Sequence, residues 1–506
     1  MGEMNKTIRI PLAVDMHMGM GDLPHATGTG GSLFPVEFMS YMKNLVADKD
    51  SNGEVHARLR PRIRSVITNT SGKTKGRGIF FKQSGTLYIV NDNTVYRTDY
   101  GTTVGTITTG ASPVYWAEMA DHTVLIDTYN NQGWTIDGLQ NLVQIADSDF
   151  PASLAGGVVE LNGRCYVLDR SSTLYNSASD DPTSWGALDF ISAERSKDSN
   201  VFITKHHDHI VVFGQRTIEF FYDNANPTGS PLSRRSDVFY NVGAMGYDSV
   251  YTDGDVIYFL SREGVDGWGF YKLENFNLIK ISKSWLDAAL DRWMQVLPRM
   301  VYLSEMQGQG KRLILLNFVD RASNTISTMT YATGEATLAY DVDSGMFSLI
   351  STALYTTNTS LFPVMGAGSF RNEVVPATGN NRYIFPDGEI YTMDDDANDS
   401  TTPESVDIKI RTGWQDGGTN KYKYCRSLEV VGNAADDVTL TLSYSDTSNL
   451  DASYTVSRTV SLLADYAKRK LTRLGRFVRR NFQLSATVTD DVRLSAVELE
   501  IGLGDV

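Results

Sequence analysis

The densest group of side chains that could bind a metal is the run His206, His207 and His209. In an extended strand successive side chains point to opposite faces, so only His207 and His209 could share one face. A protein zinc site needs at least three ligands from the chain, and the sequence places no third ligand beside these two. The pattern favours histidines at a turn and at a strand edge, so we predict no metal site.

A second candidate for metal binding is the acidic stretch that begins at Asp394. Asp394, Asp396 and Asn398 match the spacing of the first ligands of a calcium-binding loop. That loop requires Gly at its sixth position and Glu at its twelfth, whereas this chain has Asp399 and Ser405 there. A solvated acidic linker is the better interpretation.

Signatures of catalysis are weak throughout the sequence. Residues 179–185, ending in Trp185, are similar to the Asp-box turn of sialidases, but they lack its Gly and occur once. Glycosidases also need two carboxylates that flank the scissile bond, and no such pair is identifiable. The chain has no Gly-x-Ser-x-Gly, phosphate loop or Cys/His nucleophile pattern. We therefore predict no catalytic or cofactor-binding residues and no enzyme activity.

A strongly basic segment near the end of the chain is the clearest candidate for contact with another molecule. It contains Lys468, Arg469, Lys470, Arg473, Arg476, Arg479 and Arg480, with no acid among them. Such a segment indicates an anionic partner. The alternative is a solvated hairpin, or pairing with this protein's own carboxylates. As candidate contacts with a partner or a neighbouring subunit we select Arg473, Arg476, Arg479, Arg480, Arg234, Arg235, Met18 and Met20.

The overall charge limits the classes of function. The net charge of −14, from 46 basic and 60 acidic side chains, repels DNA phosphate at long range. A conventional DNA-binding protein is therefore not expected. No apolar run reaches the roughly 18 residues of a membrane helix, and the first 14 residues lack the apolar core of a signal peptide. We expect a protein made in a cytosol, with Cys165 and Cys425 as core residues.

The middle of the chain repeats one local pattern, a tight polar turn followed by a block of apolar, β-favouring residues. The second turn positions are Gly85, His122, Gly163, His209, Gly254 and Gly310. The steps between them run from 37 to 56 residues, and each step fits one four-stranded sheet with its loops. This period predicts a β-propeller with about six sheets between Ser84 and Ile350. We expect the apolar block after each turn to be the strand nearest the axis.

The predicted fold is all-β and has four parts. Residues 1–60 show no clear periodicity and are expected as an extended arm, and 61–392 as the propeller, with insertions at 223–246 and 282–294. The second insertion has helical spacing of apolar residues and is expected to cap the propeller core. Residues 393–404 are the acidic linker. Alternating residues in 405–506 predict a C-terminal β-sandwich.

Several strings, in this order along the chain, resemble the tail nozzle, or packaged-DNA stabilisation, proteins of short-tailed (podovirus) bacteriophages, also called tail accessory factors. They are residues 18–21, 33–36, 77–80, 213–221 and 473–480. The resemblance implies a structural virion protein, present as a ring of six below the portal adaptor, or head-to-tail connector protein. Such a ring lines the DNA channel and retains packaged DNA until ejection. The protein would be made in the bacterial host cytoplasm and reside in the virion tail.

The resemblance also implies partners: a tail needle, plug or tip protein, tail fibres or spikes, and genomic dsDNA that passes without sequence-specific binding. The Gly-rich N-terminal arm and the stretch 351–381 depart from the pattern, which leaves the plug and fibre partners open. An acidic channel suits sliding DNA, because every Lys or Arg contact adds a binding well that the duplex must leave. By this logic the basic segment docks on an acidic protein surface.

Two other classes of function stay open. One is a receptor- or glycan-binding propeller protein of the tail, in which Trp116, Trp134 and Trp268 could stack on sugars. The regular placement of these residues favours core packing instead. A propeller glycoside hydrolase ranks lowest.

Overall fold

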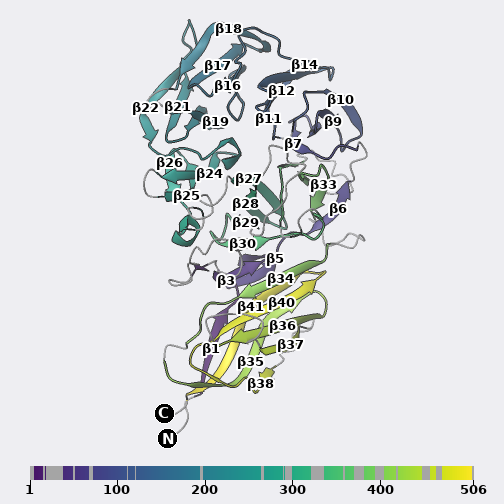
Figure 1. The fold of residues 1–506 in the computed structure, drawn as a ribbon, viewed down its shortest axis with the longest axis vertical. Coiled ribbons are helices and arrows are strands. Elements are labelled where there is room, and N and C mark those ends of the chain that lie inside the picture. Colours follow the sequence, from purple (N-terminus) through teal and green to yellow (C-terminus); the bar gives the residue numbers. More distant parts are fainter. Residues whose placement is uncertain are drawn as a thin grey trace.

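The structure, a computed structural model, describes most of the chain. The described residues are 5–14, 17–18, 38–49, 52–67, 72–110, 112–119, 121–193, 198–263, 267–288, 290, 299–320, 336–356, 359, 361–369, 381–393, 404–416, 420–446, 456–462 and 470–503. They form a wheel of four-stranded sheets with an elongated sandwich attached to its edge (Figure 1). In these ranges no helix is both long and apolar enough to span a membrane.

Six sheets between Gly76 and Ile350 each contain four consecutive antiparallel strands, which confirms the propeller and the count of about six over this range. The first comprises β7 (Gly76–Phe81), β8 (Leu87–Asn91), β9 (Thr94–Arg97) and β10 (Thr102–Thr106). The second comprises β11 (Tyr115–Glu118), β12 (His122–Asp127), β13 (Gln132–Asp137) and β14 (Leu142–Gln144). The third comprises β15 (Val159–Leu161), β16 (Arg164–Leu168), β17 (Thr173–Ala178) and β18 (Asp181–Ser192).

The next three sheets repeat this layout. The fourth comprises β19 (Asn200–His206), β20 (His209–Gly214), β21 (Ile218–Asp223) and β22 (Leu232–Tyr240). The fifth comprises β23 (Val250–Asp253), β24 (Val256–Glu263), β25 (Gly267–Glu274) and β26 (Asn277–Lys280). The sixth comprises β27 (Arg299–Gly308), β28 (Lys311–Asp320), β29 (Ala336–Asp341) and β30 (Phe347–Ile350). The 3₁₀ turn η1 (Tyr247–Ser249) precedes the fifth sheet.

The recurring turns are the hairpins between the first and second strands of each sheet. Gly163, Gly254 and Gly310 adopt φ of +74°, +57° and +74°, as the turn chemistry requires. His209 belongs to β20 and does not adopt a positive φ. His207 adopts the positive φ of 51° in that turn instead.

The expectation that the apolar block is the innermost strand is corrected by the sheet order. The block after each turn is the second strand, such as β8, whose residues are all buried. The first strands meet around the axis, where they border a cavity. Second strands are the more apolar because both of their faces pack against neighbouring sheets.

A further four-stranded sheet closes the wheel. It comprises β31 (Gly366–Ser369), β32 (Asn381–Ile384), β33 (Ile390–Met393) and β6 (Ile63–Ile67). Its outer strand β6 precedes the first sheet in the sequence, so the two ends of the wheel are joined by hydrogen bonds. The Arg382 Nε lies 3.0 Å from an Asp99 oxygen of the first sheet, and the Gly76 N–H donates to the Pro386 carbonyl at 3.1 Å.

The sandwich is built from two sheets that draw strands from both ends of the chain. One has the order β38 (Lys470–Thr472), β35 (Lys423–Ala434), β41 (Val492–Leu503), β5 (Val55–Leu59) and β4 (Leu45–Lys49), with β1 (Asn5–Pro11) on β41 and β39 (Arg476–Phe477) on β35. The other continues the sixth propeller sheet, because β30 pairs with β3 (Phe38–Lys43). From β3 its order is β34 (Val406–Arg411), β40 (Asn481–Val488), β36 (Val438–Ser445) and β37 (Val456–Leu462), and β2 (His17–Met18) also pairs with β3.

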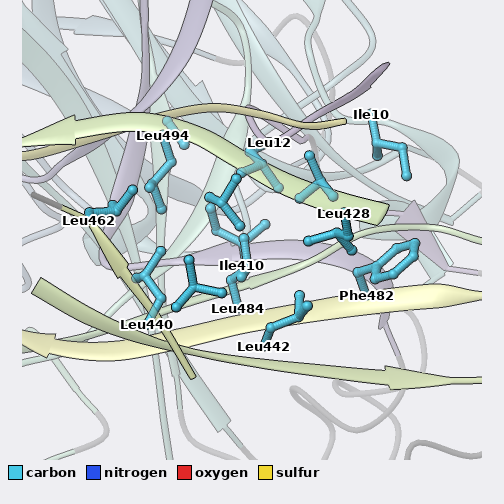
Figure 2. Close-up of a cluster of buried hydrophobic side chains, with 14 of the residues drawn as sticks. Ile10, Leu12, Ile410, Leu428, Leu440, Leu442, Leu462, Phe482, Leu484 and Leu494 are labelled. Atoms are coloured by element: carbon cyan, nitrogen blue, oxygen red, sulfur yellow. The ribbon is translucent and has the colours of Figure 1, made fainter. Parts of the chain in front are cut away.

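The described part of residues 1–60 therefore differs from the extended arm expected from the sequence. Ile10 and Leu12 of the N-terminal segment pack among Leu428, Leu440 and Leu494 in the sandwich core (Figure 2). Alternating apolar residues on β1 face this core while the intervening polar residues stay outside. The N-terminal strands thus belong to the same body as residues 405–503.

The two expected insertions have different outcomes. Part of 223–246 is not a loop, because residues 232–240 form β22, the outer strand of the fourth sheet. Residues 284–288 and 290 are helical, and Trp285 packs edge-on against Phe347 at 5.5 Å between ring centres. This helix covers the buried cluster between the fifth and sixth sheets.

Candidate functional site

A cavity of about 650 Å³ lies on the axis of the wheel. Every first strand contributes to its wall, through Phe81, Glu118, Glu160, Lys205, Thr252, Gln307 and Ala367. A second axial cavity of about 270 Å³ is lined mostly by apolar and aromatic side chains, including Tyr115, Phe202 and Tyr302. The larger volume lies within the roughly 300–1,000 Å³ of small-molecule sites. A DNA duplex has a major groove about 12 Å wide and is wider still as a whole, so a cavity of this volume is too small to admit it.

The carboxylates of the larger cavity have partners within the fold. Glu118 accepts the Gln83 N–H at 2.8 Å, and Glu160 accepts the Gly163 N–H at 2.9 Å, so both brace the hairpins at the cavity mouth. Glu305 shares a side-chain hydrogen bond with Tyr251, and burial raises the pKa of both groups. This arrangement gives a polar wall rather than a pair of carboxylates placed for acid–base chemistry.

The three histidines lie at the junction of the fourth and fifth sheets. His206 Nε2 accepts the Phe276 N–H at 3.1 Å, and His207 Nδ1 lies 3.3 Å from Asp255. His209 Nε2 lies 3.4 Å from the Arg235 guanidinium. Burial lowers the pKa of His206 and of His209. Across the described ranges, no group of three His, Cys, Asp or Glu side chains is placed to hold a metal ion.

Ser179 and Asp180 form the turn between β17 and β18, and residues 181–185 are the first residues of β18. The Asp181 carboxylate accepts the Thr183 N–H at 2.9 Å, and the Trp185 indole donates to the Pro182 carbonyl at 2.9 Å. Trp185 is buried. The segment is a turn that ends in a packed tryptophan.

The basic segment divides into one buried and several exposed arginines. Arg480 is buried; its Nε lies 2.6 Å from Asp446 and its Nη1 donates to the Leu474 carbonyl at 2.7 Å. Its guanidinium packs over the rings of Tyr444 and Phe477. Arg480 is therefore part of the domain interior and cannot dock on a partner in this state. The run of basic residues in the sequence does not show that Arg480 is buried, because its partner carboxylate, Asp446, lies 34 residues away along the chain.

The exposed arginines form a surface together with aromatic residues. Arg476 stacks on Tyr422 and Arg479 stacks on Trp414, at 5.0 and 4.9 Å from the ring centres. Tyr422 and Tyr424 are 48% and 50% exposed. Arg473 is exposed in the turn before β39. We call Arg473, Arg476, Arg479, Trp414, Tyr422 and Tyr424 the Arg–Tyr surface.

Sequence reasoning missed the two tyrosines of this surface. Residues 421–424 read Lys-Tyr-Lys-Tyr, and in a strand that alternation places Tyr422 and Tyr424 on one face. Lys423 points to the other face and is buried. Lys468 and Arg469 lie outside the described residues, and Lys470 begins β38.

The other contacts proposed from the sequence are scattered. Arg234 lies 2.7 Å from Glu219, and Arg235 lies 3.0 Å from Asp237 and stacks on Phe276. Both arginines therefore have partners within the propeller. Met18 belongs to β2, and Met20 lies outside the described residues.

The tryptophans considered for sugar stacking are packing residues. The Trp116 ring stacks on Phe80 and on Tyr88, with ring centres 5.5 and 6.0 Å apart. Trp134 packs against the same cluster, and Trp268 packs between the fifth and sixth sheets. These contacts explain the three rings as packing residues, and Trp116 also lines both axial cavities.

Comparison with known proteins gives one match in sequence. Residues 37–337 match the family model described as "Bacteriophage P22 Gp10, beta-propeller". No curated protein matches the chain.

Similar solved structures include virginiamycin B lyase from Staphylococcus aureus and BamB from Moraxella catarrhalis. The lyase is 10% identical with a TM-score of 0.41, over 65% of this chain and 98% of its own. BamB is 9% identical with a TM-score of 0.36, over 66% of this chain and 99% of its own.

Proposed function

Because the chain belongs to the bacteriophage P22 Gp10 β-propeller family, we propose that it is a structural protein of a phage tail. In this proposal six copies form the distal ring, or nozzle, below the portal adaptor. The ring lines the DNA channel and retains packaged DNA until ejection. The family match, which covers more than half of the chain, is the observation that carries the proposal.

The dimensions of the propeller support a channel formed between copies. The axial cavity of about 650 Å³ cannot conduct a duplex. A DNA channel must therefore lie on the symmetry axis of a ring, bounded by the outer surfaces of several chains. The net charge of −14 favours sliding of DNA past such surfaces, because few phosphate contacts would hold it.

The neighbours in this proposal are the portal adaptor on one side and a needle, plug or tip protein on the other, with fibres or spikes attached nearby. The protein acts without catalysis. The carboxylates of the axial cavity support this reading, since Glu118 and Glu160 brace hairpins and Glu305 pairs with Tyr251.

Genetic removal of the protein from the phage tests the proposal. Particles assembled without it should fill with DNA and then lose it, and electron micrographs should show tails that lack their distal ring. Purified protein added to these particles should restore both the ring and infectivity. Particles that keep their DNA and infect normally without the protein would refute the proposal.

A further inference from the structure

The charge of the chain is divided unequally between its two bodies. Residues 1–60 and 405–506, which include every described sandwich strand, together hold 20 basic and 20 acidic side chains, and this leaves 26 basic and 40 acidic side chains in residues 61–404. The whole negative surplus therefore lies in the part that contains the propeller. Propellers of two copies repel each other unless a basic surface lies between them.

The Arg–Tyr surface is the basic surface best placed to do this. Arg476 on β39 pairs with Tyr424 at the start of β35, and Tyr424 pairs in turn with Gly502 of β41. This end of the sandwich, with β38 and both chain termini, points away from the propeller (Figure 1). The surface therefore stands at the tip of the elongated chain, free of its own propeller.

The Arg–Tyr surface has the composition of a protein interface. Arg, Tyr and Trp are the residues most enriched at interface hot spots. The guanidinium groups of Arg476 and Arg479 are held against aromatic rings, and a guanidinium that stacks on a ring can still donate its N–H groups to a carboxylate. Because the side chains are already ordered, binding loses less conformational entropy.

A matching acidic surface surrounds the mouth of the axial cavity. In each four-stranded sheet the hairpin between strands one and two and the hairpin between strands three and four emerge on the same face of the wheel. The exposed carboxylates in or beside these hairpins are Asp121, Asp180, Asp208, Asp255 and Asp343, and they outnumber the exposed cation Lys205 on the same face. We call this side of the propeller the hairpin face.

We propose that the Arg–Tyr surface of one copy binds the hairpin face of the next copy, head to tail. Such a contact uses two different surfaces of the same chain, so its repetition closes a ring when the rotation from one copy to the next is a whole fraction of a turn. The inference rests on the proposed function and adds the surfaces that join the copies. Contact between full charges at a partly exposed interface weakens as salt screens them.

Charge reversal on each surface tests the contact. The tip variant is Arg476→Glu with Arg479→Glu, and the face variant is Asp121→Arg with Asp208→Arg. A control, Arg458→Glu, reverses a charge at an exposed position elsewhere in the sandwich. Self-association is measured on the full chain by sedimentation at several salt concentrations, and the thermal transition confirms folding.

Each variant alone should associate at least about tenfold more weakly than the parent, while the control should associate as the parent does. A mixture of tip and face variants should regain association, because each acidic tip then meets a basic face and each basic tip an acidic face. Parental association by the tip variant, or failure of the mixture, would overturn the inference. So would selective loss, in the tip variant, of binding to a short DNA duplex that the parent binds, since the surface would then be a DNA contact. The presence of the protein in tails is measured separately, so a negative result here leaves the proposed function standing.

Discussion

The Arg60 guanidinium lies 3.0 Å from a Glu404 carboxylate oxygen, and the two side chains are 0% and 2% exposed. The propeller strand β6 begins at Ile63, just after Arg60, and the sandwich strand β34 begins at Val406, just after Glu404. Arg60 also donates to the Ser351 carbonyl at 2.7 Å and to the Asn44 side chain at 3.1 Å. One buried ion pair therefore ties the start, the sixth sheet and the end of the propeller to the sandwich.

Replacement of Arg60 by Met should destabilise the protein by about 3–5 kcal/mol, because it leaves a buried carboxylate without its cation. Adding Glu404→Gln should recover part of that loss, since the remaining group is then neutral. Denaturant unfolding of the single and double variants measures both effects. Arg9→Met is the control, because the exposed Arg9–Glu54 pair contributes less than about 1 kcal/mol. Equal stability of the Arg60 and Arg9 variants would contradict the role of the buried pair.

Valine at the hairpin glycines should destabilise the propeller by roughly 1–3 kcal/mol, because a β-branched residue avoids positive φ. Gly163→Val should be the worse of two variants, since its Cβ would also lie 2.6 Å from an Asp180 oxygen. Gly254 has φ of +57° but open space around it. Gly138→Val, in a hairpin without positive φ, serves as the control. The turn assignment fails if all three variants melt together.

The histidine cluster should make stability fall at acid pH. Burial lowers the folded-state pKa of His206 and His209 below the unfolded value of about 6.5, so the unfolded chain binds protons first. Their contribution to the free energy of unfolding is fully present above about pH 6.5, and it is lost as the pH falls below that value toward the folded-state pKa. Arg235 faces His209 and strengthens the effect, whereas Asp208 opposes it.

The variant His206→Asn should flatten the dependence of the melting temperature on pH between 7 and 5. His56→Asn, in the sandwich, is the matched histidine control. An unchanged pH slope in the His206 variant would contradict the assignment.

A buried carboxyl in the last sheet should act with the opposite sign. Burial raises the pKa of Asp387 to about 6, from 3.8. The folded state then holds a proton that the unfolded state has lost, so stability falls as pH rises from about 4 through 6. Asp387→Asn keeps the acceptor for the Glu389 N–H and should stabilise the protein by about 1–2 kcal/mol at pH 8. Little change is expected at pH 4.

Asp137→Asn is the contrasting variant for this prediction. Hydrogen bonds from Asn141 lower the pKa of Asp137, so its replacement should bring no gain at pH 8. Unfolding curves at the two pH values distinguish the cases. Equal responses of the two variants would show that burial of Asp387 is not the cause.

Local patterns predicted the propeller well, because a hairpin and its strands are specified by neighbouring residues. Gly163 and Gly310 were recognisable as turn residues from their place before apolar blocks. The alternation of Ile8, Ile10 and Leu12 was also present in the sequence, but the strand that pairs with it lies almost 500 residues away. Nothing local distinguishes a free arm from a strand whose partner is so distant.

The Arg–Tyr surface could be predicted less well than the propeller, because it also depends on residues that are distant in the sequence. Arg479 and Arg480 are adjacent and chemically alike, yet one is exposed and the other is buried. The difference arises from Asp446, which pairs with Arg480, and from the backbone, in which Arg479 lies in a bend and Arg480 in an isolated bridge to Gln415. A count of charges describes a segment, whereas docking depends on which side chains the tertiary structure leaves outside.

The pairing of β1 with β41 sets a condition on biosynthesis, because Asn5 lies opposite Gly502. At roughly 5–20 residues per second, the ribosome needs on the order of half a minute to a minute and a half to supply the partner of the first strand. The propeller can form during this interval, while the apolar face of β1 waits. A chain whose translation stops early lacks β41. The apolar face of β1 then stays exposed, and the end of the sandwich that carries the Arg–Tyr surface is incomplete. Ring assembly through the sandwich would thus admit only chains that were translated to the end.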